Sequence, residues 1–277
     1  MSDEAPLRTT REPWGVRLIL DRPSKLNALN GPMVAALVAA LDEAEADPEV
    51  RVIVLEGAGR AFSSGYDLTE EAEGAIGGPV AWRELLAADV AATLRVLDSP
   101  KPVIAQVHGY ALAGGLELAM ACDLIVAAEG SMLGEPEIRY GSAPVTLLMP
   151  YLIGQKKTRE LLLTGDLIDA AEAERIGLIN RVVPLDRLAA EVDSLADRLA
   201  RTPPEVMGPT KRMLNRAMDA AGFRLAVEAG LDLGAIINAA DTPEQREWDA
   251  IVRRDGLKAA LAWRDRRYDD RLADRGT

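Results

Sequence analysis

The sequence has few of the side chains that bind metals or form disulfides: it contains one histidine and one cysteine, His108 and Cys122. A single cysteine excludes a disulfide within the chain, and a metal site usually needs several His, Cys or carboxylate ligands at short spacing. We therefore expect no bound metal. A lone free thiol is typical of a reducing compartment, so we expect a cytoplasmic protein.

The sequence is also short of basic residues and of long apolar runs. Its 32 Lys and Arg against 44 Asp and Glu give a formal net charge of −12, which argues against nucleic acid or an anionic membrane surface as the main partner. No run of about 18 apolar residues is present, so no membrane span is predicted. The 277 residues are 48% apolar, enough for one large domain or two typical ones.

The stretch GYALAGGLELAMACD, residues 109–123, carries one charged side chain before its final aspartate, Glu117. A carboxylate among apolar residues is costly unless it is paired, hydrogen-bonded or used in chemistry. A helix that starts at Gly114 and Gly115 leaves its first N–H groups unpaired at its positive end. The stretch therefore predicts an anion-binding backbone and a carboxylate within one helical turn. The alternative is that Glu117 only stabilises the first turn of that helix.

Strand and helix patterns alternate over the first 184 residues. Strands are predicted at residues 16–20, 50–57, 102–107, 123–128 and 178–183, and helices at 33–46, 80–98, 155–163 and 169–176. This alternation is typical of an α/β fold with right-handed crossovers. The polar residues 1–13 are expected to form a frayed tail. Five further helices are predicted at 185–201, 203–221, 223–240, 243–254 and 256–264.

A second candidate carboxylate is Glu137, in the segment GEPEIRYG twenty residues after Glu117. The predicted strand between them can bring both to one end of the sheet. Two carboxylates at one site divide acid and base roles when their environments separate their pKa values. The alternative is that Glu137 is an ordinary solvated loop residue beside Glu135.

The loop after the second predicted strand contains Ser63, Ser64 and Gly65, whose N–H groups can face a ligand at the carboxyl edge of the sheet. An ordinary turn explains the loop equally well. A nucleophilic serine is not indicated, because the motif G-x-S-x-G is absent and the one candidate base is His108. A histidine beside an apolar strand favours a structural role.

Several segments, taken in order, resemble the crotonase (enoyl-CoA hydratase/isomerase) superfamily. They cover about residues 14–265 and are DRPSKLNAL, RAFSSGYDL, VHGYALAGGLELAMACDLIVAA, LGEPEI, TGDLIDAAEAERIGLINRVVP and DGLKAALAWRDRR. The resemblance implies a spiral of ββα repeats in residues 14–200 and a helical region in 201–277 that forms a homotrimer, often paired into a hexamer. It also implies an acyl-CoA substrate, a place in fatty acid metabolism, and no separate cofactor, because coenzyme A is part of the substrate.

The resemblance assigns a role to each candidate residue. The backbone N–H groups of Ser64 and Gly114 match the oxyanion hole, which grips the thioester oxygen. Glu117 takes a proton from the water that attacks Cβ, and Glu137 delivers a proton to Cα. This is the reaction of an enoyl-CoA hydratase, the reversible addition of water across the 2,3 double bond. The residues expected to bind the substrate and its coenzyme A are Ala28, Ser63, Ser64, Gly65, Tyr66, Asp67 and Gly114.

One segment departs from the superfamily pattern. Hydratases usually have a glycine-rich turn near the position of Pro144, where this chain has the bulkier Val145, Thr146 and Leu147. The departure leaves open a Δ3,Δ2-enoyl-CoA isomerase, or a hydrolase or carbon–carbon lyase acting on a CoA thioester. A CoA-binding scaffold or an RNA binder is a further alternative, which the acidic composition and the intact glutamate pair disfavour.

Overall fold

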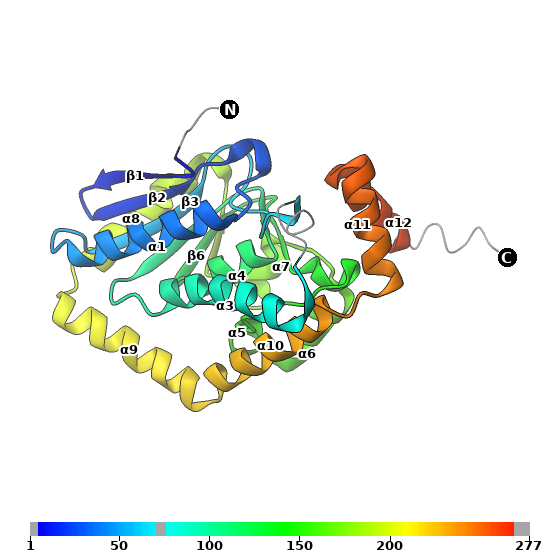
Figure 1. The fold of residues 1–277 in the computed structure, drawn as a ribbon. Coiled ribbons are helices and arrows are strands. Elements are labelled where there is room, and N and C mark those ends of the chain that lie inside the picture. The colour runs from blue at the N-terminus through cyan, green and yellow to red at the C-terminus, as the bar shows by residue number, and fades with distance from the viewer. Residues whose placement is uncertain (1–4, 70–75, 269–277) are drawn as a thin grey trace.

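The computed structural model describes residues 5–69 and 76–268, and its main sheet has six strands in the order β1-β2-β3-β4-β6-β9. The strands are β1 (Leu7–Glu12), β2 (Gly15–Leu20), β3 (Val52–Gly57), β4 (Val103–Val107), β6 (Leu124–Ala128) and β9 (Arg181–Val183). β1 is antiparallel to β2, and the later neighbours are parallel (Figure 1). The carboxyl ends of the parallel strands therefore meet at one edge, where α/β proteins bind ligands.

A second sheet of three short strands lies next to this edge. It is formed by β5 (Tyr110–Leu112), β7 (Met132–Gly134) and β8 (Ile168–Asp169). Strand β4 is followed by β5 and helix α4 (Gly114–Ala121), and β6 is followed by β7 and the 3₁₀ helix η2 (Pro136–Tyr140). Each unit therefore passes from the main sheet through the small sheet into a helical turn, as expected for ββα repeats.

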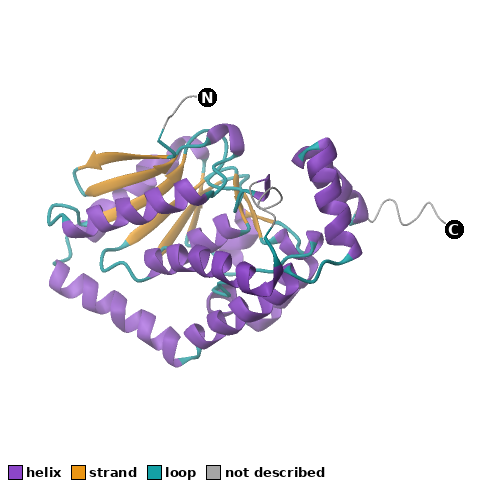
Figure 2. Ribbon diagram, viewed as in Figure 1, coloured by secondary structure: helices purple, strands orange, loops and turns teal. Residues whose placement is uncertain are grey.

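Helices cover both faces of the main sheet (Figure 2). On one face, α1 (Gly31–Ala46), α3 (Gly78–Leu97) and α4 bury side chains such as Leu37 and Leu116 against Leu18 and Leu55. On the other face, α8 (Leu188–Ala200) buries Val192 in a second apolar cluster with strand residues. The central strands are buried on both sides, which explains their almost wholly apolar sequences.

Most of the other described residues are helical. The remaining helices are α5 (Met149–Ile153), α6 (Gln155–Thr164), α7 (Ala170–Arg175), α9 (Pro204–Ala220), α10 (Phe223–Asn238), α11 (Pro243–Asp255) and α12 (Leu257–Arg267), with short 3₁₀ helices η1 (Pro23–Lys25) and η3 (Leu185–Arg187). Helix α10 packs along α3, and α11 packs against α12 and η2. In Figure 1 the pair α11 and α12 stands beside the rest of the molecule, at its right edge.

The α/β class and most predicted elements are confirmed, including the five C-terminal helices. The predicted tail is wrong for residues 7–12, because they form β1; this polar edge strand gains its order from backbone pairing with β2 rather than from burial. The strands of the small sheet were not predicted, because two or three residues carry no periodic signal. No helix in the described ranges is long and apolar enough to cross a bilayer.

Candidate active site

A strained turn brings the start of α4 against the loop that follows β3. Ala113, just before the helix, has a φ of +53°, which is uncommon for a residue with a side chain. A Cβ atom at Gly114 would lie 2.3 Å from the ring of Tyr66, and one at Gly115 would lie 2.8 Å from Ser63. Both glycines are therefore needed for the close approach, and the predicted helix start is confirmed.

Glu117 is buried in the first turn of α4 with only 4% of its surface exposed. Its Oε1 accepts hydrogen bonds from the N–H groups of Val145 (3.1 Å) and Thr146 (2.8 Å), and its Oε2 accepts one from Thr146 Oγ1 (2.8 Å). Burial raises the pKa of Glu117 above its usual value, and the three donors oppose that rise. The carboxylate is thus held in one orientation with an increased affinity for a proton.

Glu137 lies on η2 immediately after Pro136 and is also buried. Its side chain lines the same cavity as Glu117, together with Ser64 and Gly114. The cavity is partly open to solvent, and its empty space, including the opening, measures about 590 Å³. The structure therefore brings together the four residues that were predicted to form the catalytic pair and the oxyanion hole, although their roles stay a prediction.

A third buried carboxyl group accompanies this pair. Glu135, the residue before Pro136, is 2% exposed, and Glu137 is 7% exposed, so the alternative of a solvated Glu137 is wrong. Burial first, and then the charges of Glu117 and Glu137, raise the pKa of Glu135 well above its usual value. No pattern in the sequence distinguished Glu135 from a surface residue, because its burial depends on contacts between segments that are distant in the chain.

The two predicted oxyanion donors differ in the structure. Gly114 is the first residue of α4, so its N–H has no acceptor within the helix and remains directed outward from its end. The N–H of Ser64 instead donates to the carbonyl oxygen of Leu26 at 3.0 Å. Ser64 lines the cavity, but its amide is already used to hold the loop, so the prediction of Ser64 as an oxyanion donor is not supported.

The neighbouring Tyr66 is better placed to supply a second amide. Gly65 accepts a hydrogen bond from Leu29 N–H at 2.8 Å, and Asp67 N–H donates to Leu29 at 3.0 Å. Leu29 and Tyr66 form a parallel β-bridge through these two bonds, so the N–H of Tyr66 points away from Leu29. The start of α4 is close to this segment, since a Cβ at Gly65 would lie 3.2 Å from the nitrogen of Gly114.

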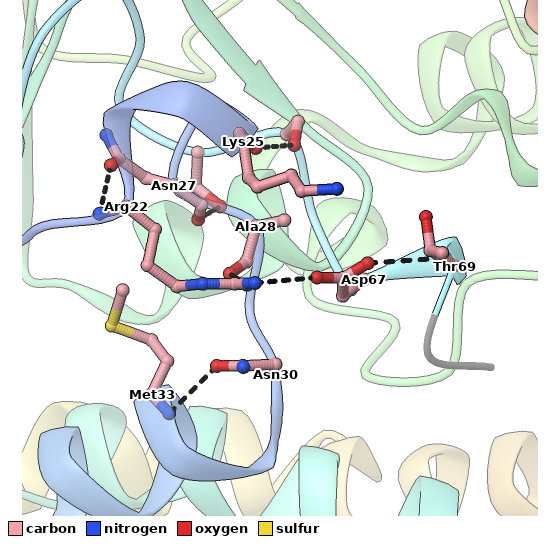
Figure 3. A network of polar contacts seen from close by, with 10 residues as sticks. Arg22, Lys25, Asn27, Ala28, Asn30, Met33, Asp67 and Thr69 are labelled. Carbon is pink, nitrogen blue, oxygen red and sulfur yellow. Dashed lines mark hydrogen bonds and ion pairs between the residues drawn. The ribbon is translucent and has the colours of Figure 1, made fainter. Parts of the chain in front are cut away.

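A polar network fixes the loop predicted to bind coenzyme A (Figure 3). Arg22 pairs with Asp67 at 2.9 Å and donates to the carbonyl oxygen of Ala28 at 2.6 Å. The amide of Asn27 donates to backbone carbonyls of the β3 loop, and Ser63 Oγ donates to the backbone oxygen of Asn27. These contacts join the segment around residues 22–28 to that around 61–67, so Asp67 and Ser63 act as internal braces.

An open hollow adjoins Tyr66, and its lining includes neither Glu117 nor Glu137. It measures about 940 Å³, and its wall includes Leu29, Asn30, Tyr66 and Asp67. The hollow shares Tyr66 and Asp89 with the carboxylate cavity. The loops expected to hold coenzyme A therefore border a space that adjoins the carboxylates, whereas Ala28 is buried and braces the loop.

The segment that departs from the superfamily pattern, residues 145–147, supplies the hydrogen-bond donors to Glu117, and we call it the donor wall. Leu147 has a φ of +49°, so this turn is strained. A Cβ at Gly230 of α10 would lie 2.5 Å from the backbone oxygen of Val145, which means that α10 presses directly on the wall. The bulkier residues noted in the sequence thus replace a glycine-rich turn with one that supplies a side-chain donor, Thr146.

The histidine and cysteine lie apart from this chemistry. His108 Nε2 donates to the carbonyl oxygen of Gly59 at 3.0 Å, in agreement with a structural role. Cys122 is buried, and burial raises the pKa of its thiol. Within residues 5–69 and 76–268, no group of three or more His, Cys, Asp or Glu side chains is placed to hold a metal ion.

The fold defines the class of protein. The crystal structure of an enoyl-CoA hydratase/isomerase from Xanthobacter autotrophicus Py2 superposes with a TM-score of 0.92 over 95% of this chain and 98% of that chain, at 41% identity. The architecture is therefore that of the crotonase superfamily.

The sequence comparison places the chain more closely. Residues 14–240 match the model of the enoyl-CoA hydratase/isomerase family, and the chain belongs to that family. A protein of Thermus thermophilus assigned as an enoyl-CoA hydratase is 39% identical over 80% of this chain and 87% of its own length. The 2,3-dehydroadipyl-CoA hydratase of Escherichia coli is 33% identical over 81% of this chain and 86% of its own length.

Proposed function

We propose that this protein is an enoyl-CoA hydratase, which adds water reversibly across the 2,3 double bond of a 2-enoyl-CoA thioester. The observation that carries the proposal is the convergence of Glu117, Glu137 and the Gly114 amide on one cavity. The cavity adjoins the loops that resemble the coenzyme A site. The relative from Thermus thermophilus, which is named as an enoyl-CoA hydratase, supports the same reaction.

Each group at the site has a separate role in the proposed reaction. The thioester oxygen accepts a hydrogen bond from the N–H of Gly114 at the positive end of α4, with the amide of Tyr66 as the second donor in place of Ser64. Glu117, ionised and fixed by Thr146, takes one proton from the attacking water as oxygen bonds to Cβ. Glu137 gives a proton to Cα, which consumes the enolate electron pair and completes the addition.

The protons taken up and released by the two glutamates balance over one turnover. Glu117 ends protonated and Glu137 ends ionised, so the enzyme returns to its starting state when a proton leaves Glu117 and another reaches Glu137. The raised pKa of the buried carboxyls keeps protons near the pair during this reset. The oxyanion donors stabilise the enolate oxygen, and a group of this kind is typically worth about 3 kcal/mol.

The direct test uses purified protein and crotonyl-CoA. We expect loss of the conjugated enoyl absorbance and a product heavier by one water, with the same equilibrium reached from the 3-hydroxyacyl-CoA side. Turnover of no 2-enoyl-CoA would overturn the proposal.

An isomerase is the second candidate, because both oxygens of Glu117 already accept hydrogen bonds from Val145 and Thr146. Such a fixed carboxylate leaves Glu137 to move one proton from Cγ to Cα, which converts a 3-enoyl into a 2-enoyl thioester. Incubation with 3-hexenoyl-CoA distinguishes the two: an isomerase yields 2-hexenoyl-CoA as the final product, and a hydratase alone does not consume the substrate.

The assembly is proposed to be a homotrimer, alone or paired as a hexamer. Helices α9 and α10 expose large apolar side chains, among them Val206, Met213, Leu214, Leu225, Leu233 and Ile236. A cluster of this kind is typical of a surface that a partner covers. Analytical ultracentrifugation measures the mass, and a monomer at micromolar concentration would contradict this assembly. A cytoplasmic location stays a prediction from the lone cysteine.

A further inference from the structure

The carboxylate cavity extends well beyond the two glutamates. From Glu117 and Glu137 it continues along α3, where Trp82, Leu86 and Val90 line it. It then joins a second hollow of about 520 Å³, to which α11 contributes Trp248. The two spaces share Leu68, Trp82, Tyr140, Ser142 and Asn238. The hollow beside the loops expected to hold coenzyme A shares Tyr66 and Asp89 with the carboxylate cavity but no residue with the second hollow. With coenzyme A in the former, the extension is the space left for an acyl group that starts at the carboxylates.

The extension is rich in aromatic side chains although the chain is poor in them. The sequence has 4 Trp, 5 Tyr and 2 Phe among 277 residues. Trp82, Tyr140 and Trp248 all line the extension, and the rings of Tyr140 and Trp248 stack with centroids 5.0 Å apart at 20°. Flat aromatic walls favour flat or bulky apolar groups, because ring stacking adds to the area that is buried.

Among the described residues, every acidic or basic side chain that lines this space is an Asp or a Glu. Asp89 and Asp249 join Glu117 and Glu137, and the two linings contain no Lys, Arg or His. The arginines adjacent in the sequence to Trp82 and Tyr140 form ion pairs with residues outside this space. Arg83 follows Trp82 and pairs with Asp232 at 2.7 Å. Arg139 precedes Tyr140 and pairs with Asp166. Asp249 pairs with Arg253 at 3.7 Å, and Arg253 is part of neither lining. A negatively charged acyl terminus would therefore meet carboxyl groups and no cationic side chain in the lining.

We infer that the acyl group is bulky, apolar and uncharged, with an aryl group such as the phenyl ring of cinnamoyl-CoA preferred over a four-carbon chain and over a chain that ends in a carboxylate. This inference rests on the proposed function, because it names the substrate class of that site. It also separates this chain from its relative whose name specifies 2,3-dehydroadipyl-CoA, a thioester with a carboxylate at the far end.

The first experiment compares the wild-type protein on four thioesters. Hydration of cinnamoyl-CoA, 2-hexenoyl-CoA, crotonyl-CoA and 2,3-dehydroadipyl-CoA is followed to obtain kcat/KM. We expect kcat/KM for cinnamoyl-CoA to exceed that for crotonyl-CoA at least tenfold, and 2-hexenoyl-CoA to exceed 2,3-dehydroadipyl-CoA about a hundredfold. Equal values for crotonyl and cinnamoyl thioesters, or for the hexenoyl and dehydroadipyl ones, would overturn the inference.

Two variants of Trp82 test whether the aromatic wall sets the preference for an aryl group. Trp82→Leu removes one aromatic wall and should lower the ratio of cinnamoyl to crotonyl kcat/KM about tenfold, whereas Trp82→Phe should largely keep the ratio. Trp14→Leu is the control, because Trp14 packs with β3 and α8 in a separate apolar cluster and lines neither space. An unchanged ratio in Trp82→Leu would contradict the role of this wall.

A positive charge added to the lining gives an independent test. Asn238 lines both spaces at the end of α10, where a cation is favoured by the helix dipole. Asn238→Lys should raise the ratio of dehydroadipyl to hexenoyl kcat/KM at least tenfold, and Asn238→Gln, the neutral control, should leave it unchanged. No gain in Asn238→Lys would contradict the exclusion of anionic acyl groups by charge.

Calorimetry keeps this inference separate from the reaction itself. The saturated analogues 3-phenylpropanoyl-CoA, butyryl-CoA and adipoyl-CoA bind without turnover, and we expect their affinities to fall in that order. If this order holds but no 2-enoyl-CoA is hydrated, the hydratase proposal is overturned and the acyl preference stands. If the three bind equally while crotonyl-CoA is hydrated, the acyl preference is overturned and the hydratase proposal stands.

Discussion

Thr146 Oγ1 donates a 2.8 Å hydrogen bond to Oε2 of Glu117, and both side chains are buried. The hydroxyl favours the ionised form of the carboxyl group, so it partly offsets the rise in the pKa of Glu117 that burial causes. We therefore expect Thr146→Val to raise this pKa further. Because Glu117 acts as a base only when ionised, the acidic limb of the kcat/KM profile should move to higher pH by about one unit, as one lost hydrogen bond to a charged group implies.

The control for this change is Thr146→Ser, which keeps the hydroxyl group and should keep the wild-type profile. The measurement is kcat/KM for an enoyl-CoA between pH 4.5 and 8. An acidic limb at the same pH in Thr146→Val and wild type would show that the hydroxyl does not influence the catalytic base.

Glu135 should make the stability of the protein depend on pH. Its pKa is raised above the unfolded value of 4.5 by burial and by Glu117 and Glu137. The folded state then binds more protons than the unfolded state above about pH 4.5, so stability falls as the pH rises from there toward the folded pKa, by at most about 1.4 kcal/mol per pH unit. Glu135→Gln removes this fall and should be more stable than wild type at pH 7.5.

Chemical denaturation at pH 4.5, 6 and 7.5 measures the effect. The difference in free energy of unfolding between Glu135→Gln and wild type should grow with pH and be smallest at pH 4.5. A difference that is independent of pH would mean that Glu135 does not titrate abnormally.

The contact between α10 and the donor wall predicts a specific effect of a small substitution. Gly230→Ala normally stabilises a helix interior by about 1 kcal/mol. Here the new Cβ would lie 2.5 Å from the backbone oxygen of Val145, so the wall must move away from α10 and disturb the donors to Glu117. We expect kcat to fall at least tenfold and the free energy of unfolding to fall by about 1–3 kcal/mol.

The comparison variant is Gly208→Ala in α9, where the nearest atom to the new Cβ is Pro100 O at 3.3 Å. Its kcat should stay within twofold of wild type. Equal kcat values for Gly230→Ala and Gly208→Ala would argue against control of Glu117 by α10.

The Arg22–Asp67 pair should matter for substrate binding more than for chemistry. The pair is largely buried and braces the loop proposed to hold coenzyme A. Asp67→Asn should raise KM for an enoyl-CoA about fivefold, change kcat little, and lower the free energy of unfolding by about 2 kcal/mol. Asp241→Asn is a matched control, because Asp241 pairs with Arg246 at the same 2.9 Å in an exposed position. A larger effect on kcat than on KM in Asp67→Asn would assign the pair a different role.

The sequence was informative where one segment carried its own signal. Apolar strands and periodic helices were predicted near their observed bounds, and the glycines before α4 indicated its start. Glu117 and Glu137 were singled out as candidates from their surroundings in the chain, an apolar helix and a turn between glycines, and the family resemblance assigned their roles, which stay a prediction. The tail was misjudged because an edge strand such as β1 is stabilised by backbone pairing, which side-chain patterns do not reveal.

The features missed in the site depend on contacts between distant segments. The use of the Ser64 amide by Leu26 joins two loops that are 38 positions apart in the chain. Glu135 is buried close to Glu117 of α4, and Thr146 donates to Glu117 although 29 positions separate the two residues in the chain. Such contacts follow from the tertiary arrangement, and a single sequence gives no local pattern for them.

The central claim is that Glu117 and Glu137 act together on one water. It is tested most directly by kcat for crotonyl-CoA hydration in Glu117→Gln, Glu137→Gln and the double variant. Glutamine keeps the shape of each side chain and one carbonyl oxygen to accept the donors around Glu117, so each variant should fold. We predict that each single change lowers kcat about a thousandfold and that the double variant is no slower than the slower single one, because the two groups serve the same step. Wild-type kcat in either single variant would contradict the account.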